Sequence, residues 1–460
     1  MGEHVRKAIL SKYLIVGFLL LIFLAPFGVE ARGSADFICV LSFAVNGLLF
    51  IAKIYRATRR HSVSMDLIYW LFMFFFMYFS PVIQYRLKTF PWRGMVSENE
   101  ILQVNLVVLL FNIAFLCGCY IARRVKFIGV PALGFCKWLC SSFEFKKRGK
   151  ILLSLIMCAC TAYSLSRTGL TGIFVARAQA IQAFYSGNNS AIELIVESVI
   201  PSFMAYVVAE AAQSMIQKKE NCFRFVLLFL CLLICFFPTA IPRYKAATIY
   251  GVIFIVVFPF ISKGSNFFWL FTIGFFLVFP LLHALRNSLS QESIQNMLSN
   301  GFFESYTSGN YDAWRMLASA LRHNKNYGCT WGGQLLGSLL FFVPSAIWSS
   351  KPIGSGAMLI KKELGSSVFA NVSCPFVAEG MVNFGIVGVL IFALTLSFLV
   401  TKLDSAYWNN AEKNNRRGLF APYLFLVFML FFVMRGDLLS GFAYVCGFVA
   451  TGFMLKPFLK

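Results

Sequence analysis

The sequence has little charge, few acidic residues and almost no histidine. Only 13% of its 460 residues are Asp, Glu, Lys or Arg, and four are histidine. Soluble globular chains are roughly one-quarter charged, so this composition excludes a water-soluble protein and a disordered one. No soluble segment interleaves basic and aromatic residues over the length that a nucleic-acid-binding domain needs. Nucleic acid is therefore excluded as a partner.

Motifs that hold nucleotides, metals or a catalytic nucleophile are also missing. The chain has no Walker A loop, no GxGxxG after a strand, no HExxH and no GxSxG. No Cys and His cluster has zinc spacing, and no acidic cluster resembles a divalent-cation site. The sequence therefore predicts neither ATP-driven transport nor a bound metal or other cofactor.

Apolar residues make up 59% of the chain, and phenylalanine alone occurs 53 times. A helix needs about 20 mostly apolar residues to cross a bilayer. Reading the sequence for such runs predicts an all-α polytopic membrane protein with about twelve transmembrane helices. The runs centre on 13–29, 36–52, 66–83, 101–121, 151–165, 192–214, 225–241, 246–262, 267–285, 381–401, 418–434 and 438–455.

The basic residues give this map an orientation. The chain has 41 Lys and Arg against 19 Asp and Glu, and basic residues that flank spans favour the cytoplasmic side. With a cytoplasmic amino terminus, 25 of the 41 fall in the inner segments. Both termini are therefore predicted to be cytoplasmic.

The map divides the chain into three parts. Residues 1–285 form a nine-helix transmembrane part that includes an outer loop at 166–191, and 381–460 form three further spans. Between them, we expect 286–380 to form a large outer loop that contains short helices. Loops of this length usually carry function. Its apolar stretch 335–348 is broken by a proline and too short to span, so we expect it to lie on or dip into the outer leaflet.

Two cysteines, Cys329 and Cys374, lie in this outer loop. In an oxidising compartment they could form a disulfide. The sequence leaves open whether they pair or stay free.

Basic side chains gather at the outer ends of the spans and in the long loop. Arginine binds phosphate or carboxylate through two parallel hydrogen bonds and keeps its proton, so a ring of arginines suits a lipid-linked pyrophosphate. The alternative for each residue is an interfacial side chain that reaches for water. For Arg243, which stands alone in a tight turn between two spans after Pro242, a functional role is preferred over an interfacial one. The candidates are Arg167, Arg243, Arg286, Arg315, Arg322, Lys351 and Arg435.

Three residues are candidates for a general base. Glu379 begins the span at 381–401, with Asn383 one turn on, and its carboxylate could accept a hydroxyl proton; the alternative is an interfacial cap. Asp312 precedes Arg315 by three residues, which equally fits an ion pair within one helix. His323 could act as a base or bind phosphate, although surface histidines are common in loops.

Four strings resemble the bacterial O-antigen polymerases, the Wzy-type oligosaccharide repeat-unit polymerases. They are SRTG (166–169), PRYKAAT (242–248), FVPSAIWSSKP (342–352) and AEGMVNFGIVG (378–388). The topology is similar over nearly the whole chain. A family pattern of arginine, ten residues and glycine fits Arg322 to Gly333 in the long loop. It fails in the loop at 166–191, where Arg177 and Gly187 are one residue too close.

The resemblance implies an inner-membrane glycosyltransferase of the GT-C-like class, inverting and independent of metal. Its substrates would be undecaprenyl-pyrophosphate-linked oligosaccharides, joined on the periplasmic face with release of undecaprenyl pyrophosphate. Arg167, Arg243 and Arg286 are the first choices for contacts to pyrophosphate or glycan. Binding of a chain-length regulator protein stays open.

Two other functions fit the same map. An O-antigen ligase-like transferase also has twelve spans, a large outer loop and outer arginines. This alternative is retained because the long loop contains His323. A lipid-linked oligosaccharide flippase is the alternative from the transporter class. Transporters tend to have repeated halves and charges at the membrane midplane, whereas the polar residues here lie mainly at one outer face.

Overall fold

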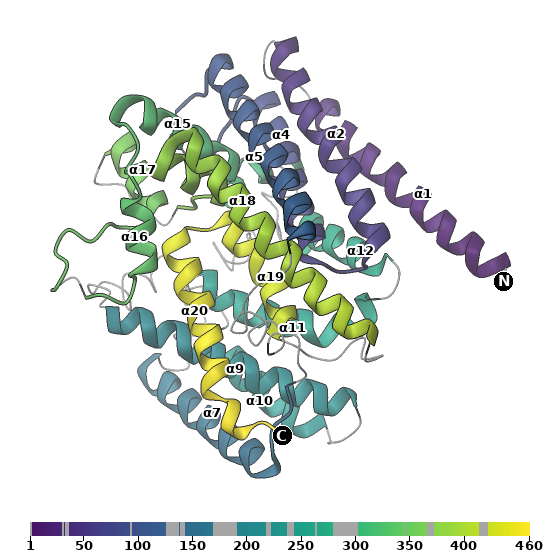
Figure 1. Cartoon of the computed structure of the whole chain (residues 1–460), viewed down its shortest axis with the longest axis vertical. Helices are drawn as coiled ribbons and strands as arrows, with labels where there is room; N and C mark the ends of the chain where they lie inside the picture. Colours follow the sequence, from purple (N-terminus) through teal and green to yellow (C-terminus); the bar gives the residue numbers. More distant parts are fainter. Residues whose placement is uncertain are drawn as a thin grey trace.

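The computed structural model describes most of the chain (Figure 1). The described residues are 2–29, 32, 36–92, 94–125, 138, 143–168, 191–217, 222–236, 243–262, 265–278, 302–344, 346–365, 372–413 and 422–460. All regular structure in these ranges is helical, which confirms the predicted all-α class.

Every apolar run predicted from the sequence coincides with a helix in its described residues. The helices are α1 (Gly2–Leu24), α2 (Phe37–Arg60), α3 (Met65–Phe74), α4 (Ser80–Arg86), α5 (Glu98–Arg124), α7 (Lys147–Thr168), α9 (Ala191–Ile216), α10 (Cys222–Phe236), α11 (Arg243–Ile261), α12 (Asn266–Ile273), α15 (Ala313–Tyr327), α16 (Gly333–Leu339), α17 (Ser355–Leu364), α18 (Phe376–Lys413), α19 (Pro422–Arg435) and α20 (Leu438–Met454). Short π or 3-10 turns are η1 (Ala25–Gly28), η2 (Phe75–Phe79), η4 (Gly274–Val278), η5 (Phe302–Thr307), η6 (Gly309–Tyr311) and η7 (Lys456–Phe458).

Several helices are long and apolar enough to cross a membrane, as the composition predicts. Within the described part five meet both criteria: Phe37–Arg60, Met65–Arg86, Glu98–Arg124, Val199–Ile216 and Phe376–Asn409. Six more apolar helices are shorter: Tyr13–Gly28, Cys222–Cys235, Thr248–Ile261, Asn266–Leu277, Pro422–Arg435 and Leu438–Met454. The count of twelve spans stays a prediction.

The centre of one group of helices is the continuous segment Met65–Arg86, made of α3, η2 and α4. Its apolar window is 94% buried, because α2, α18 and α19 pack around it. A helix that is apolar on all sides is found in the core of a protein or in a membrane. The π turn Phe75–Phe79 interrupts it, and such bulges often occur near functional sites.

A second group consists of α7, α9 and α10, which pack together at the lower end of Figure 1. Helix α9 also packs against α11 and α20, which connect this group to the first. Inside the group, the buried Glu210 forms salt bridges with Lys150 of α7 and Arg224 of α10, each at 2.9 Å. These partners neutralise a carboxylate that would otherwise be costly to bury.

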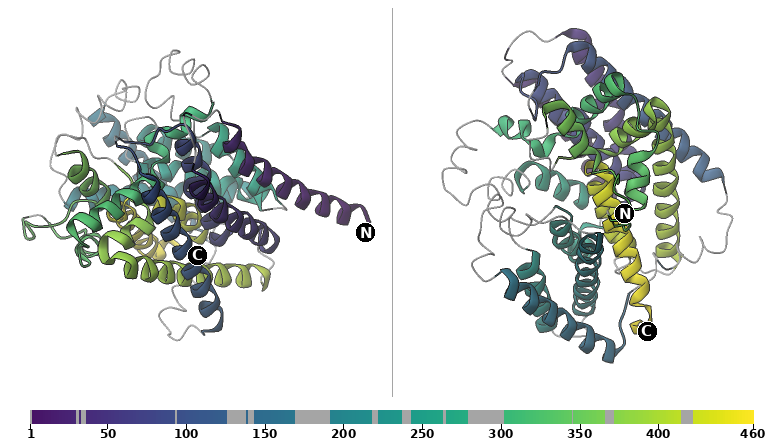
Figure 2. Two further views of the ribbon diagram at one scale, coloured as in Figure 1. Left: turned by 90° about the horizontal axis from the view of Figure 1, so that it is seen from above. Right: turned by 90° about the vertical axis from the view of Figure 1, so that its left-hand side faces the viewer.

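The segment after residue 301 folds into a helical cap, defined here as η5, η6, α15, α16 and α17. In Figure 1, α15 and α17 lie at the upper left and α16 lies below them, and the green cap helices lie beside the yellow-green α18 in both views of Figure 2. Buried hydrogen bonds join the cap to the helices beneath. Gln84 of α4 donates to the carbonyls of Tyr306 and Tyr311, and Trp314 of α15 donates to Asn105 of α5.

Helix α18 contains a sharp break at Phe384 and Gly385, where Gly385 has φ +61°. The short arm before the break folds back on the long arm, so that Gly380 and Gly388 meet. A Cβ at Gly388 would overlap the carbonyl oxygen of Gly380, and only glycine permits this contact. Glu379 therefore lies in the first turn of α18, on the short arm before the break.

The apolar stretch 335–348 does not form one interfacial helix. Helix α16 ends at Leu339, and the described residues that follow it, 340–344 and 346–348, form no helix. Lys351 closes this segment because its ammonium donates to the carbonyls of Phe341 and Val343, at 2.6 and 2.9 Å. The predicted contact with the outer leaflet stays a prediction.

Candidate functional site

The cap and the helix ends beneath it bring six of the predicted site residues to one end of the molecule. They are Asp312, Arg315, Arg322, His323, Glu379 and Arg435. The other candidates are not all described. Arg167 lies in the last turn of α7 and Arg243 is the first residue of α11, but their side chains fall outside the described part, as does all of Arg286.

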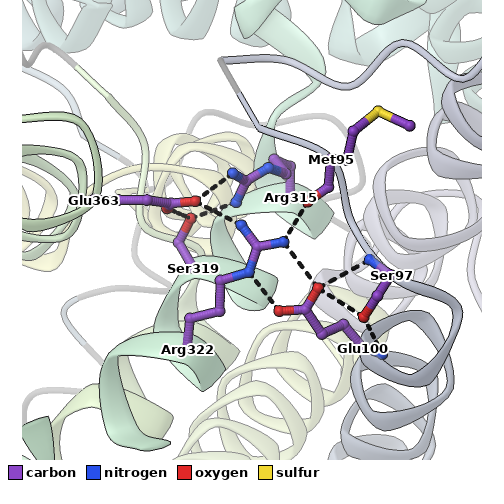
Figure 3. A network of polar contacts seen from close by, with 7 residues as sticks. All are labelled: Met95, Ser97, Glu100, Arg315, Ser319, Arg322 and Glu363. Atoms are coloured by element: carbon purple, nitrogen blue, oxygen red, sulfur yellow. Dashed lines mark hydrogen bonds and ion pairs between the residues drawn. The ribbon is translucent and has the colours of Figure 1, made fainter. Parts of the chain in front are cut away.

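Arg315 of α15 is completely buried and holds α17 in place (Figure 3). Its guanidinium forms a 2.5 Å salt bridge with Glu363 and donates to Ser319 at 2.6 Å. Ser319 in turn donates to the second carboxylate oxygen of Glu363 at 2.6 Å. Burial alone would raise the pKa of Glu363, but the hydrogen bonds from Arg315 and Ser319 outweigh it and hold that pKa below its usual value.

Arg322, two turns further along α15, ties the cap to α5 (Figure 3). It binds both carboxylate oxygens of Glu100, at 2.5 and 2.8 Å, in a bidentate pair. It also donates to Glu363 at 2.7 Å and to the carbonyl of Met95 at 2.5 Å. Four acceptors from the protein therefore surround this guanidinium.

Asp312 is buried and accepts hydrogen bonds at both carboxylate oxygens. Ser373 donates to Oδ1 at 2.5 Å, and the indole of Trp92 donates to Oδ2 at 3.1 Å. Its ion-pair partner is Arg435, at 3.5 Å. The pair with Arg315 inside α15 is not formed, because Arg315 points to Glu363 instead.

Arg435 ends α19 beneath the cap. It donates to the carbonyl of Gly309 at 3.1 Å, and its guanidinium carbon lies 5.9 Å from the ring centre of Phe76. Phe76 belongs to the π turn of the central helix, so Arg435 connects that turn, Asp312 and the cap. A guanidinium over an aromatic face is stabilised by the ring quadrupole.

Glu379 acts as a cap for a neighbouring helix. Its Oε1 accepts from the backbone amide of Leu438, which starts α20, and its Oε2 accepts from the hydroxyl of Ser355, which starts α17. Asp437 completes the arrangement by accepting from the amide of Gly356. Both carboxylates satisfy helix amides that have no partner within their own helix. Glu379 therefore caps the start of α20 through a backbone amide, and its other contact is a serine hydroxyl, not a basic side chain.

His323 differs from the two acids because one ring nitrogen has no partner. The side chain is 6% exposed, and its Nδ1 has no hydrogen-bond partner among the described residues. Burial, followed by the charge of Lys362, lowers its pKa below 6.5. The imidazole is therefore neutral at pH 7 and able to accept a proton.

The remaining predicted residues of the long loop serve the structure of the cap. Burial lowers the pKa of Lys351, whose ammonium donates to two carbonyls.

Cys329 and Cys374 are both free thiols, which resolves the open alternative against a disulfide. Burial, then the charges of Glu379 and Asp437, raise the pKa of Cys374, so it is protonated at neutral pH.

Sequence reasoning missed several partners in this region. Glu100 carried a signal, because Ser97 and Glu100 form the S-x-x-E capping box before an apolar run. Glu363, Ser373 and Trp92 carried none, since their roles depend on contacts between distant segments. Trp92 has φ +64°, which is rare for a bulky residue and marks local backbone strain.

Comparisons with known protein families, curated proteins and solved structures find no match for this chain.

Proposed function

We propose that this chain is a bacterial inner-membrane glycosyltransferase of the GT-C-like class that polymerises lipid-linked oligosaccharide repeat units on the periplasmic face. The donor is a growing glycan on undecaprenyl pyrophosphate, and the acceptor is one lipid-linked repeat unit. A hydroxyl of the acceptor attacks the anomeric carbon of the donor with inversion, and undecaprenyl pyrophosphate leaves.

One observation carries this proposal: acids, cations and a neutral histidine gather where the cap meets one end of the helices. A lipid pyrophosphate keeps its headgroup at such an end while its tail stays in the bilayer. A site for surface catalysis is expected here, whereas a transporter is expected to place charges at the midplane. The buried charge of Glu210 has two cationic partners, both near helix starts, and does not favour transport.

The contacts divide the predicted residues by role. Arg315, Arg322 and Lys351 already have protein acceptors, so we assign them to positioning the cap. The pyrophosphate contacts then go to Arg167, Arg243 and Arg286. Negative charge develops on the leaving group, and preorganised guanidiniums stabilise that charge strongly.

Among the base candidates, His323 best fits the acceptance of the hydroxyl proton. Glu379 and Asp312 each have both carboxylate oxygens engaged. His323 is neutral and has an unpaired ring nitrogen. Its small exposed fraction means that the acceptor must displace part of the cap to reach it.

Deletion of the gene in the native bacterium, followed by lipopolysaccharide gel analysis, tests the function. We expect lipid A core that carries a single repeat unit. Core without any repeat, while polymer accumulates on undecaprenyl pyrophosphate, would indicate a ligase. Loss of both products with repeat units trapped on the cytoplasmic face would indicate a flippase.

Complementation tests the residue assignment. Arg243→Ala and His323→Ala are expected to restore no ladder at wild-type expression, and Arg243→Lys only a partial one, since lysine lacks the bidentate fork. Arg124→Ala is the control, because Arg124 is exposed at the opposite end of α5 and contacts Tyr120 of its own helix. Full rescue by Arg243→Ala and His323→Ala would overturn the assignment and leave the reaction class standing.

A further inference from the structure

A second polar site lies at the end of the molecule opposite the cap. A cavity of about 110 Å³ opens between the last turns of α2 and α5, the start of α3 and the second half of α18. Helix α5 runs from Glu100 under the cap to Arg123 at this cavity. At 1.5 Å per residue these positions are about 35 Å apart, close to the roughly 30 Å thickness of a bilayer core. The cavity therefore lies where the second membrane boundary is expected for a spanning α5.

Two exposed arginines line this cavity, Arg60 of α2 and Arg123 of α5. Neither forms a salt bridge with a residue that the structure describes, although the charges of both act on the nearby Asp66 carboxylate. The two acids in the cavity have other partners. Asp404 accepts from the amides of Met65 and Asp66 and from a tyrosine hydroxyl, and Asp66 accepts from an indole.

The indole of Trp408 provides an independent indication of a ligand. Trp408 lines the cavity and is 7% exposed, and its ring stacks on His61 with centres 4.5 Å apart. Its Nε1–H has no acceptor among the described residues. A buried donor without an acceptor is costly, so an oxygen of a bound group would satisfy it.

From this geometry we infer that the cavity binds the phosphate of an anionic phospholipid headgroup. Two guanidiniums and an unpaired indole N–H supply donors, and a phosphate presents only acceptors. The cavity holds several waters, and one phosphate group occupies a similar space. Basic pockets between helices at a membrane boundary suit such headgroups. This inference is independent of the proposed reaction, since it concerns the opposite end of the molecule.

The test uses the full-length protein, purified in a neutral detergent and titrated with phosphatidylglycerol or with diacylglycerol of the same acyl chains. Binding is followed by native mass spectrometry. We expect the wild type to bind phosphatidylglycerol and not diacylglycerol. The double variant Arg60→Gln/Arg123→Gln is expected to bind it on the order of ten-fold more weakly or worse, because charge-assisted hydrogen bonds are lost.

The chain offers a matched control in the neighbouring residues. Arg59→Gln/Arg124→Gln removes the same charge from the same helix turns, but both arginines lie over tyrosines of their own helices and outside the cavity. We expect this variant to bind like the wild type. Equal loss in both double variants, or no loss in Arg60→Gln/Arg123→Gln, would overturn the proposal.

Two further measurements define the ligand. Trp408→Phe keeps the ring stacked on His61 and removes the N–H, so several-fold weaker binding of phosphatidylglycerol is expected; unchanged binding would remove the indole from the site and overturn the proposed donor set. Glycerol phosphate is titrated as the soluble source. If it binds as tightly as the lipid, with the same loss in Arg60→Gln/Arg123→Gln, the lipid assignment is overturned in favour of a soluble phosphate compound.

Discussion

Replacement of Arg315 by methionine should loosen α17 from α15 within the cap. The guanidinium is completely buried, and its removal leaves the Glu363 carboxylate with Arg322 and Ser319 only. Breaking a buried ion pair from one side costs about 3–5 kcal/mol. Glu363 is 19% exposed and retains a partner, so we expect the lower end, about 3 kcal/mol.

The double variant Arg315→Met/Glu363→Met should lose less stability than Arg315→Met alone. Removing both charges leaves no unpaired carboxylate, and Arg322 keeps both oxygens of Glu100. The coupling energy in a double-mutant cycle should be about 1–3 kcal/mol. Lys361→Met on the same helix is the control, because Lys361 is exposed and its loss should change stability by less than about 0.5 kcal/mol.

Equilibrium unfolding in mixed detergent micelles measures these free energies, and hydrogen exchange localises the change to α15 and α17. Two results would refute the reasoning. One is an Arg315→Met protein as stable as the Lys361→Met control. The other is a double variant in which the two single losses simply add.

Other predictions concern the break in α18 and the titration of the cap. Gly388→Ala forces a methyl into the facing helix arm and should destabilise the protein by about 1–3 kcal/mol in the same unfolding assay; Gly274→Ala, with open space around it, should not. The pKa of Glu363 lies below its usual value of 4.5 in the folded protein, so the ionised carboxylate stabilises the fold at pH values above 4.5. Stability should therefore fall as the pH drops below 4.5, and Glu363→Gln should flatten that part of the pH profile. The pKa of His323 lies below 6.5 in the folded protein, so as the pH falls through 6.5 the unfolded chain takes up a proton that the folded chain does not. Stability should therefore also fall as the pH drops below 6.5. A stability profile of His323→Gln as steep in this range as that of the wild type would contradict this.

The sequence predicts the apolar helices well because a run of about 20 apolar residues favours a helix. Over the described residues each predicted run coincides with helix, and the long segment between the runs 267–285 and 381–401 carries helices of its own. The break in α18 could not be predicted, because the spacing of Gly380 and Gly388 fits a straight helix equally well. Only their contact explains why both are glycine.

Partners within the site were harder to predict than its members. The sequence places Asp312 three residues before Arg315, which suggests a pair, yet each side chain binds a residue from another helix. Similarly, Glu379 caps α20, which begins about 60 residues later in the chain. Such choices depend on tertiary contacts that local spacing does not encode.

Reconstitution tests the central claim most directly. The purified chain is placed in proteoliposomes with a polyprenyl-pyrophosphate-linked oligosaccharide repeat unit and EDTA. The account predicts a ladder of longer glycans, with one polyprenyl pyrophosphate released for each bond formed. Repeat units that stay the same length, or that only cross the bilayer, would contradict it.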